Sequence, residues 1–486
     1  MKIFNRGEKP SWGVSLIPFV ALVAVLVLVI KGFGADALSG GSQVALMFAA
    51  GVTVAIGMVF YRIPWKDFEN AMVDNISSVA TSVIILLLIG AVAGSWMISG
   101  VVPTLIYYGM KVITPAIFLF ATCVISAVIA VMTGSSWTTI ATIGVALVGI
   151  GTAQGFDPGW TAGAIISGAY FGDKVSPLSD TTVLASSSSG TPLFTHIRFM
   201  MITTVPSFLI SVVIFLVASL LHETPDLAMT ADFAQDLKDT FNISPWLLLA
   251  PVLTGLLIAR KVPAIITLFA ASVIAGVFAL IFQPHILAEV AAGGEVAEVG
   301  LSFMEGFKGL LQSYYGATAI NTGNAALNDL VATRGITGML NTVFLVIAAG
   351  TFGGAMIGSG MLQSLTEALV RFVKRRVTMV TATVGTGIFS NMITGDQYLS
   401  ILLTSSLYKK LYHDRGYESK LLSRSVEDSA TVTSVLIPWN SCGMTQATVL
   451  KVSTMTYLPY CFFNLISPLM SIIVAAIGFK IVRKQK

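Results

Sequence analysis

Charged side chains are scarce in this chain. Lys, Arg, Asp and Glu make up 11% of its 486 residues, whereas hydrophobic residues make up 55% and the mean hydropathy is +0.84. A soluble globular domain carries about 25% charged residues. Apolar runs of roughly 20 residues, long enough to cross ~30 Å of hydrocarbon, recur from end to end. The composition therefore excludes a soluble globular protein and predicts a polytopic membrane protein.

Cysteine and histidine are also rare. Cys123, Cys442 and Cys461 form no CxxC or Cys/His metal pattern, so we interpret them as packing residues. The chain has no P-loop, HExxH or Cys/His cluster, and we predict no metal cofactor or nucleotide. His196 and His413 fall in predicted loops or span ends on the cytoplasmic side, where each is either a solvated side chain or a pH sensor.

The basic residues are grouped in short clusters beside apolar runs. Such clusters are topology signals rather than a nucleic-acid surface, and the net charge is only +4. By the positive-inside rule they mark the cytoplasmic side and predict that both termini are cytoplasmic. The clusters are Arg62/Lys66, Arg260/Lys261, Arg371 with Lys374–Arg376, Lys409–Arg424 and Arg483/Lys484/Lys486.

Three apolar segments are too short to cross a membrane alone. Trp160–Phe171, Leu399–Leu411 and Thr431–Pro438 flank polar islands, as broken or re-entrant helices do. We expect about a dozen membrane elements in total.

The chain repeats itself at long range. Gly90–Gly100 aligns with Gly350–Gly360, and TGSSW at Thr133–Trp137 aligns with TGDQY at Thr394–Tyr398, at nearly the same offset. The charge distribution orients the two copies oppositely, which predicts two inverted-topology repeats, residues 1–232 and 233–486, with a site between them at mid-membrane. The spaced glycines themselves favour close helix packing over a substrate role.

The first polar island contains Ser135, Ser136 and Thr139. A helix break there frees backbone carbonyls, and these hydroxyls add oxygen ligands of the kind that hard cations such as Na⁺ prefer. The alternative is that the hydroxyls only bond back to helix carbonyls.

The second island lies between Gly172 and Gly190 and carries Asp173, Lys174, Asp180 and Thr181. Pro177 makes a continuous helix through Asp173 and Asp180 unfavourable. Ionisable groups at membrane depth are costly and usually functional, so we expect both carboxylates to bind a cation or a proton. Lys174 either neutralises Asp173 as a structural partner or has an accessory role. An N-cap by Ser179 or Asp180 is the structural alternative.

The second half offers a counterpart. Asp428 is aligned with Asp180 in the repeat only if gaps are allowed. Glu427 is either an accessory residue of the site or forms an ion pair with Arg424 at the cytoplasmic surface. We predict cation or proton binding by Asn391, Asp396, Asp428 and Asn440, with Glu427 and Thr431 as accessory residues.

Three segments resemble the NhaC-type Na⁺/H⁺ antiporter family. They are AYFGDKVSPLSDTT at Ala169–Thr182, GTPLFTHIR at Gly190–Arg198 and IPWNSCG at Ile437–Gly443. The resemblance implies exchange of external H⁺ for cytoplasmic Na⁺, and relatives in the family exchange organic acids such as malate and lactate, or move amino acids. The chain departs from the family pattern at Val183–Ser189 and Met444–Thr448.

These observations predict an all-α polytopic transporter of the bacterial inner (plasma) membrane that works by alternating access. Na⁺ binds at Asp173, Asp180 and Asp428 and is displaced by protons. The partners are a small cation, a proton, the lipid bilayer and, in the alternative function, a small organic acid. A homodimer is compatible with the sequence, although no stretch specifies one. An intramembrane hydrolase is the rival of another class, but its serine clusters lack a His or Lys partner.

Overall fold

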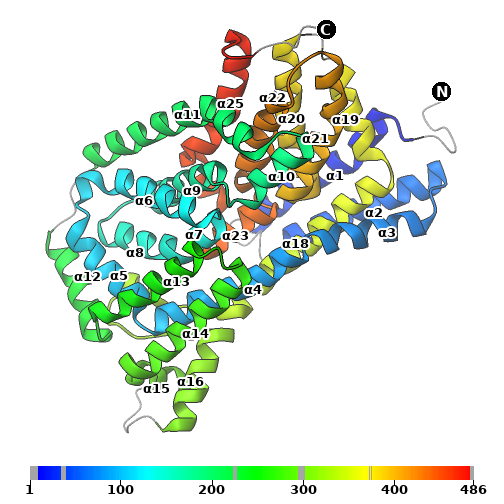
Figure 1. Cartoon of the computed structure of the whole chain (residues 1–486). Coiled ribbons are helices and arrows are strands. Elements are labelled where there is room, and N and C mark those ends of the chain that lie inside the picture. The colour runs from blue at the N-terminus through cyan, green and yellow to red at the C-terminus, as the bar shows by residue number, and fades with distance from the viewer. Residues whose placement is uncertain are drawn as a thin grey trace.

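The protein is built from helices (Figure 1). The computed structural model describes residues 9–33, 40–222, 227–293, 302–371, 373 and 375–481. Within these residues the only β pairing is one isolated bridge between Thr318 and Thr333. In the described part of the chain, eight helices are long and apolar enough to cross a membrane, or up to ten if each of two bent pairs is one span. The predicted all-helical membrane fold is confirmed.

The first part of the chain contains α1 (Trp12–Phe33), α2 (Gly41–Tyr61), α3 (Trp65–Ser78), α4 (Ala80–Ile98), α5 (Val101–Val112), α6 (Phe118–Thr133), α7 (Ser136–Thr139), α8 (Val145–Ala153), α9 (Pro158–Val175), α10 (Asp180–Ser189) and α11 (Leu193–Leu221). The second part contains α12 (Leu227–Thr240), α13 (Leu249–Ala259), α14 (Ala264–Phe282), α15 (Pro284–Ala291), α16 (Phe303–Tyr315), α17 (Ala325–Val331), α18 (Gly335–Gly358), α19 (Met361–Arg371), α20 (Arg376–Thr394), α21 (Gln397–Asp414), α22 (Ser419–Val426), α23 (Ser441–Leu450), α24 (Thr454–Tyr457) and α25 (Phe462–Ile477). π-helical turns occupy Ile140–Gly144 and Glu427–Thr431.

Several expected boundaries change. The segments expected at Trp160–Phe171 and Leu399–Leu411 belong to the longer helices α9 and α21. Thr431–Pro438 contains the end of the second π-helical turn and a short 3-10 turn. Asp232, at the boundary of the predicted halves, lies in α12 rather than in a loop, and the division into 1–232 and 233–486 stays a prediction. Lys374 and the terminal cluster Arg483/Lys484/Lys486 lie outside the described residues.

The first helix break lies between α6 and α7. Gly134 ends α6 with φ 66°, a left-handed conformation that suits glycine, and Ser135 caps α7 by accepting the Thr138 N–H. The Thr133 hydroxyl accepts the Ser135 N–H at 3.2 Å and lies 3.0 Å from the Thr139 hydroxyl. The freed N–H groups of Ser135 and Thr138 thus find partners within the break.

The second break, between α20 and α21, repeats this pattern 261 positions later. Gly395 ends α20 with φ 63°, and Asp396 caps α21 by accepting the Leu399 N–H. The Thr394 hydroxyl accepts the Asp396 N–H at 3.2 Å and lies 3.0 Å from the Ser400 hydroxyl. The repeated sequence therefore folds into a repeated local structure.

The same offset relates two further elements. The ten-residue helices α10 and α23 are capped by the side chains of Ser179 and Asn440, respectively. In this alignment the repeat position that corresponds to Asp180 is Ser441, so the alignment of Asp180 with Asp428 is wrong. A helix of ten residues is about 15 Å long. Such short helices cannot cross the bilayer alone, as expected of broken or re-entrant elements.

Glycines pack α4 closely against α18 and α16, and pack α18 closely against α3; α4 and α18 lie side by side (Figure 1). A Cβ atom on Gly90 would lie 2.5 Å from the Gly335 carbonyl oxygen, and one on Gly94 would clash with the Ser313 carbonyl oxygen. On α18, a Cβ atom on Gly354 would lie 2.5 Å from the Met72 Cα. The interpretation of these glycines as packing residues is confirmed.

We expect the Gly94→Leu variant to lose thermal stability in detergent. A leucine side chain there must displace backbone, and overpacking typically costs about 1–3 kcal/mol or more. Gly385→Leu in α20 is the matched control, because Gly385 is exposed and a Cβ atom added there would meet no other atom within 4 Å. Equal melting temperatures of the two variants would contradict the packing role.

Candidate functional site

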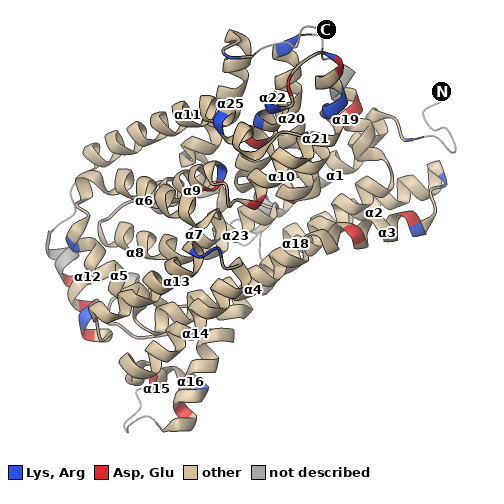
Figure 2. Cartoon of the chain, viewed as in Figure 1, with Lys and Arg blue, Asp and Glu red and all other residues tan. Residues whose placement is uncertain are grey.

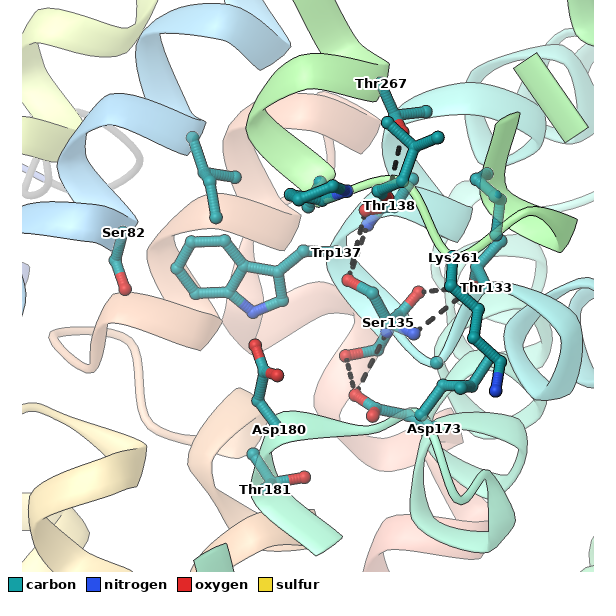
Figure 3. Close-up of a pocket in the computed structure, with 18 of the residues that line it drawn as sticks. Ser82, Thr133, Ser135, Trp137, Thr138, Asp173, Asp180, Thr181, Lys261 and Thr267 are labelled. Atoms are coloured by element: carbon teal, nitrogen blue, oxygen red, sulfur yellow. Dashed lines mark hydrogen bonds between the residues drawn. The ribbon is translucent and has the colours of Figure 1, made fainter. Parts of the chain in front are cut away.

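A cavity of about 280 Å³ lies where five parts of the chain meet (Figure 3). Its walls come from α4, the first helix break, the α9–α10 junction, the turn between α13 and α14, and the start of α21. The predicted site residues that line it are Ser135, Ser136, Asp173, Asp180 and Thr181. Two carboxylates and three hydroxyls thus face one space.

Asp173 is the anchored carboxylate of this cavity. Its Oδ2 atom accepts the Ser136 N–H at 3.0 Å and the Ser136 hydroxyl at 2.7 Å, and the side chain is buried. The helix ends two residues later, because the backbone is extended at Ser176 ahead of Pro177. The Ser176 hydroxyl donates to the Val131 carbonyl at 2.8 Å and so fixes this end of α9 to α6.

Asp180 is the free carboxylate. It is the first residue of α10, is exposed, and makes no side-chain hydrogen bond or ion pair in the described part of the chain. It is not needed as a helix cap, because Ser179 already accepts the Thr182 N–H. The Thr181 hydroxyl lies beside it and is 3.0 Å from the Ser179 hydroxyl. Asp180 is therefore available to bind a cation or a proton from the cavity.

The second helix break reaches the same cavity through two residues that the sequence analysis did not select. Gln397 and Tyr398 line the cavity from the start of α21. The Gln397 Oε1 atom accepts the Ser434 hydroxyl at 3.4 Å and the Cys442 thiol at 2.7 Å. Gln397 and Tyr398 correspond to Ser136 and Trp137 in the repeat. Because Ser136 was a predicted site residue, this correspondence could have identified them as site residues from the sequence.

The other predicted residues of the second break lie outside the cavity wall. Asp396 is buried, and its carboxylate accepts the Leu399 N–H at 2.9 Å and the Ser441 hydroxyl at 3.4 Å. Asn391 donates to the Ala430 carbonyl at 2.7 Å, and Asn440 donates to the Asn391 carbonyl at 3.2 Å. These amides therefore hold the second break together.

Two predicted hydroxyls are also buried away from the cavity. The Thr139 hydroxyl donates to the Ser135 carbonyl at 2.9 Å. This is the bond back to a helix carbonyl that we gave as the alternative for the first polar island. The Thr431 hydroxyl has no hydrogen-bond partner within the described residues.

Lys174 and Asp428 form a separate, fully buried ion pair. The Lys174 ammonium also donates to the Ser467 hydroxyl at 3.0 Å, and the Arg424 Nε atom lies 3.8 Å from Asp428 Oδ2. Lys174 is therefore a structural partner of Asp428 rather than of Asp173. Figure 2 shows most charged residues at the ends of helices and a few among the helices near α9 and α10.

Two cytoplasmic assignments from the sequence are wrong. Arg424 is fully buried and its nearest carboxylate is Asp428, whereas both Glu427 carboxylate oxygens are buried without a hydrogen bond in the described part of the chain. His196 lies in α11, where it is buried with Nδ1 2.9 Å from the Ser423 hydroxyl, so it is not a solvated loop residue. His413 is exposed near the end of α21.

Known proteins resemble almost the whole chain. A family model described as the Na⁺/H⁺ antiporter family matches residues 12–187 and 168–479. The Na⁺/H⁺ antiporter NhaC of Bacillus subtilis strain 168 is 37% identical over 431 residues, which cover 88% of this chain and 91% of the relative. The malate-2H⁺/Na⁺-lactate antiporter of the same organism is 33% identical and covers 90% and 89%. The arginine/ornithine antiporter ArcD of Halobacterium salinarum is 33% identical and covers 99% and 95%.

The buried pair predicts an order of stabilities. Asp428→Asn leaves Lys174 and Arg424 without their shared carboxylate, whereas Lys174→Met leaves Arg424 beside Asp428. Removing one partner of a buried pair typically costs about 3–5 kcal/mol, so both variants should melt earlier in detergent, with Asp428→Asn the less stable.

Lys66→Met is the matched control for this experiment, because Lys66 pairs with Glu69 on an exposed helix surface. Exposed pairs contribute about 1 kcal/mol or less. Melting temperatures of Lys174→Met and Asp428→Asn equal to that of Lys66→Met would show that the buried pair does not stabilise the fold.

Proposed function

Because this chain belongs to the Na⁺/H⁺ antiporter family, we propose that it exchanges cytoplasmic Na⁺ for external H⁺ by alternating access. The observation that carries this proposal is the pair of carboxylates in one cavity. Asp173 is held in place by Ser136, and Asp180 is free to bind an ion. A fixed ligand and a free ligand together can bind a cation and later release it.

The proposed chemistry is competition for the same oxygens. Na⁺ is a hard cation and prefers carboxylate, hydroxyl and carbonyl oxygens, which Asp173, Asp180, Ser135 and Thr181 supply around the cavity. A proton that binds to either carboxylate removes the negative charge that attracts Na⁺. Protons entering from outside therefore displace Na⁺, and Na⁺ on the cytoplasmic side displaces protons.

Asp428 takes a different role in this proposal from the one expected from the sequence. Lys174 and Arg424 already neutralise it in a buried cluster. We therefore assign Na⁺ binding to Asp173 and Asp180, and propose that Asp428 fixes Lys174 and, through it, the adjacent Asp173. No bound cofactor is needed, because an ion gradient supplies the energy.

We also propose a bacterial plasma-membrane location with both termini in the cytoplasm. The basic clusters around Arg62, Arg371 and Lys409–Lys420 support this orientation by the positive-inside rule. A homodimer stays a prediction.

A second candidate function is exchange of a small organic acid coupled to Na⁺ or H⁺. It needs a cationic or amide group to bind a carboxylate, and the candidates in the polar segments of the sequence are Lys174, Asn391 and Asn440. None of these lines the cavity, but Lys261 does. Two relatives are named as exchangers of malate and lactate or of arginine and ornithine.

The two functions are separated by one assay in proteoliposomes that hold the purified protein and an internal pH dye. For Na⁺/H⁺ exchange, a pulse of Na⁺ should move protons without any organic acid present. If Na⁺ moves no protons while labelled malate or lactate exchanges across the membrane, the first proposal fails and the second replaces it.

The Asp180→Asn variant should lose at least roughly tenfold in Na⁺-driven proton movement, because the free carboxylate is removed and each lost factor of ten corresponds to ~1.4 kcal/mol. Asp67→Asn is the matched control, since Asp67 is also an exposed acid in the first turn of a helix but lies outside the cavity. Full exchange by a folded Asp180→Asn protein would remove Asp180 from the site.

A further inference from the structure

The cavity contains one positive charge that the exchange chemistry does not require. Among the residues that line it, the charged side chains are Asp173, Asp180 and Lys261. With both carboxylates ionised and the lysine protonated, the formal charge of the lining is −1. Without Lys261 it would be −2.

The turn between α13 and α14 places Lys261 at the cavity. The backbone of Lys261 has a left-handed conformation, with φ 60°, and its N–H donates to the Ile258 carbonyl at 2.8 Å. Pro263 then caps the start of α14. This tight turn places Lys261 at its tip, and Figure 3 shows the side chain extending past Thr133 toward the Asp173 side of the cavity.

The Lys261 ammonium is not committed to another partner. Its side chain is exposed, and it makes no hydrogen bond or ion pair in the described part of the chain. The buried cations nearby differ in this respect, because Lys174 and Arg424 lie against Asp428 and do not line the cavity. Arg260, its neighbour in sequence, is exposed and is also absent from the lining.

Charge balance decides which cations such a cavity favours. Two carboxylates around hydroxyl and carbonyl oxygens make a strong site for divalent cations such as Ca²⁺, which is bound by oxygen ligands. The repulsion from a nearby ammonium is proportional to the charge of the incoming ion, so it opposes Ca²⁺ twice as strongly as Na⁺ in energy. A lining of charge −1 matches one monovalent ion.

We propose that Lys261 is a specificity-determining residue that makes this cavity select monovalent over divalent cations. It acts by its charge rather than by contact with the bound ion. This inference rests on the proposed function in one respect only, namely that the cavity of Asp173 and Asp180 is a cation site.

The test compares variants that differ in charge at this turn. If removing the charge tightens Na⁺ binding by roughly tenfold, doubling the ionic charge squares that factor, and Ca²⁺ binding should tighten roughly 100-fold. We therefore expect Lys261→Gln to bind ⁴⁵Ca²⁺ in detergent far more tightly than wild type, and Ca²⁺ to inhibit its exchange in proteoliposomes. Lys261→Arg should behave as wild type. Arg260→Gln is the matched control and should also behave as wild type.

A second measurement uses one folded protein in two charge states. The three native cysteines are buried, so a Lys261→Cys protein can be labelled at its exposed thiol. An aminoethyl thiosulfonate reagent restores a positive charge and should abolish the tight Ca²⁺ binding. A methyl thiosulfonate reagent adds no charge and should leave it intact.

Equal Ca²⁺ affinity in wild type, Lys261→Gln and both labelled proteins would overturn the proposal, whether or not exchange occurs. An equal increase in Ca²⁺ affinity in Arg260→Gln would also overturn it, because the effect would then come from any positive charge on this turn rather than from Lys261. The affinity for Ca²⁺ is measured in detergent and does not depend on transport. Tight charge-dependent binding in a protein that moves no protons would therefore support Lys261 while the exchange proposal fails.

Discussion

The structure depends on one constraint, which is the free-energy cost of removing a polar group from water without a partner inside the protein. The two helix breaks meet it in the same way. A left-handed glycine turns the chain, a threonine hydroxyl bonds to the freed backbone, and the side chain of Ser135 or Asp396 caps the next helix. Because hydroxyl caps and, at Ser136, the Asp173 carboxylate accept the freed N–H groups, a helix can end at the cavity without exposing these groups to lipid.

The same constraint separates the acidic groups by role. Asp428 is neutralised by Lys174 and Arg424 in a cluster whose three side chains are fully buried. Asp173 is held by one serine and retains an open face on the cavity, and Asp180 has no partner in the described part of the chain. A carboxylate in a buried ion pair supports the fold, whereas one that faces the cavity without an ion-pair partner is available to an ion.

Close packing gives the breaks a rigid frame. The glycines of α4 and α18 bring backbones into contact, and Gly168 and Gly172 of α9 do the same against α6. No side chain larger than hydrogen fits at these contacts without moving backbone. The packing of α9 on α6 places the end of α9, which carries Asp173, beside the first helix break.

The sequence by itself determined the membrane class, the helical fold, both helix breaks and the candidate carboxylates Asp173 and Asp180. Those features are local, because apolar length, glycine turns and hydroxyl caps are readable within a few residues. Only the tertiary structure decided that Lys174 pairs with Asp428, that Arg424 and His196 are buried, and that Gln397 and Lys261 reach the cavity. These facts depend on which distant segments pack together, and a lysine beside an apolar run has the same local pattern whether it faces the cytoplasm or an ion site.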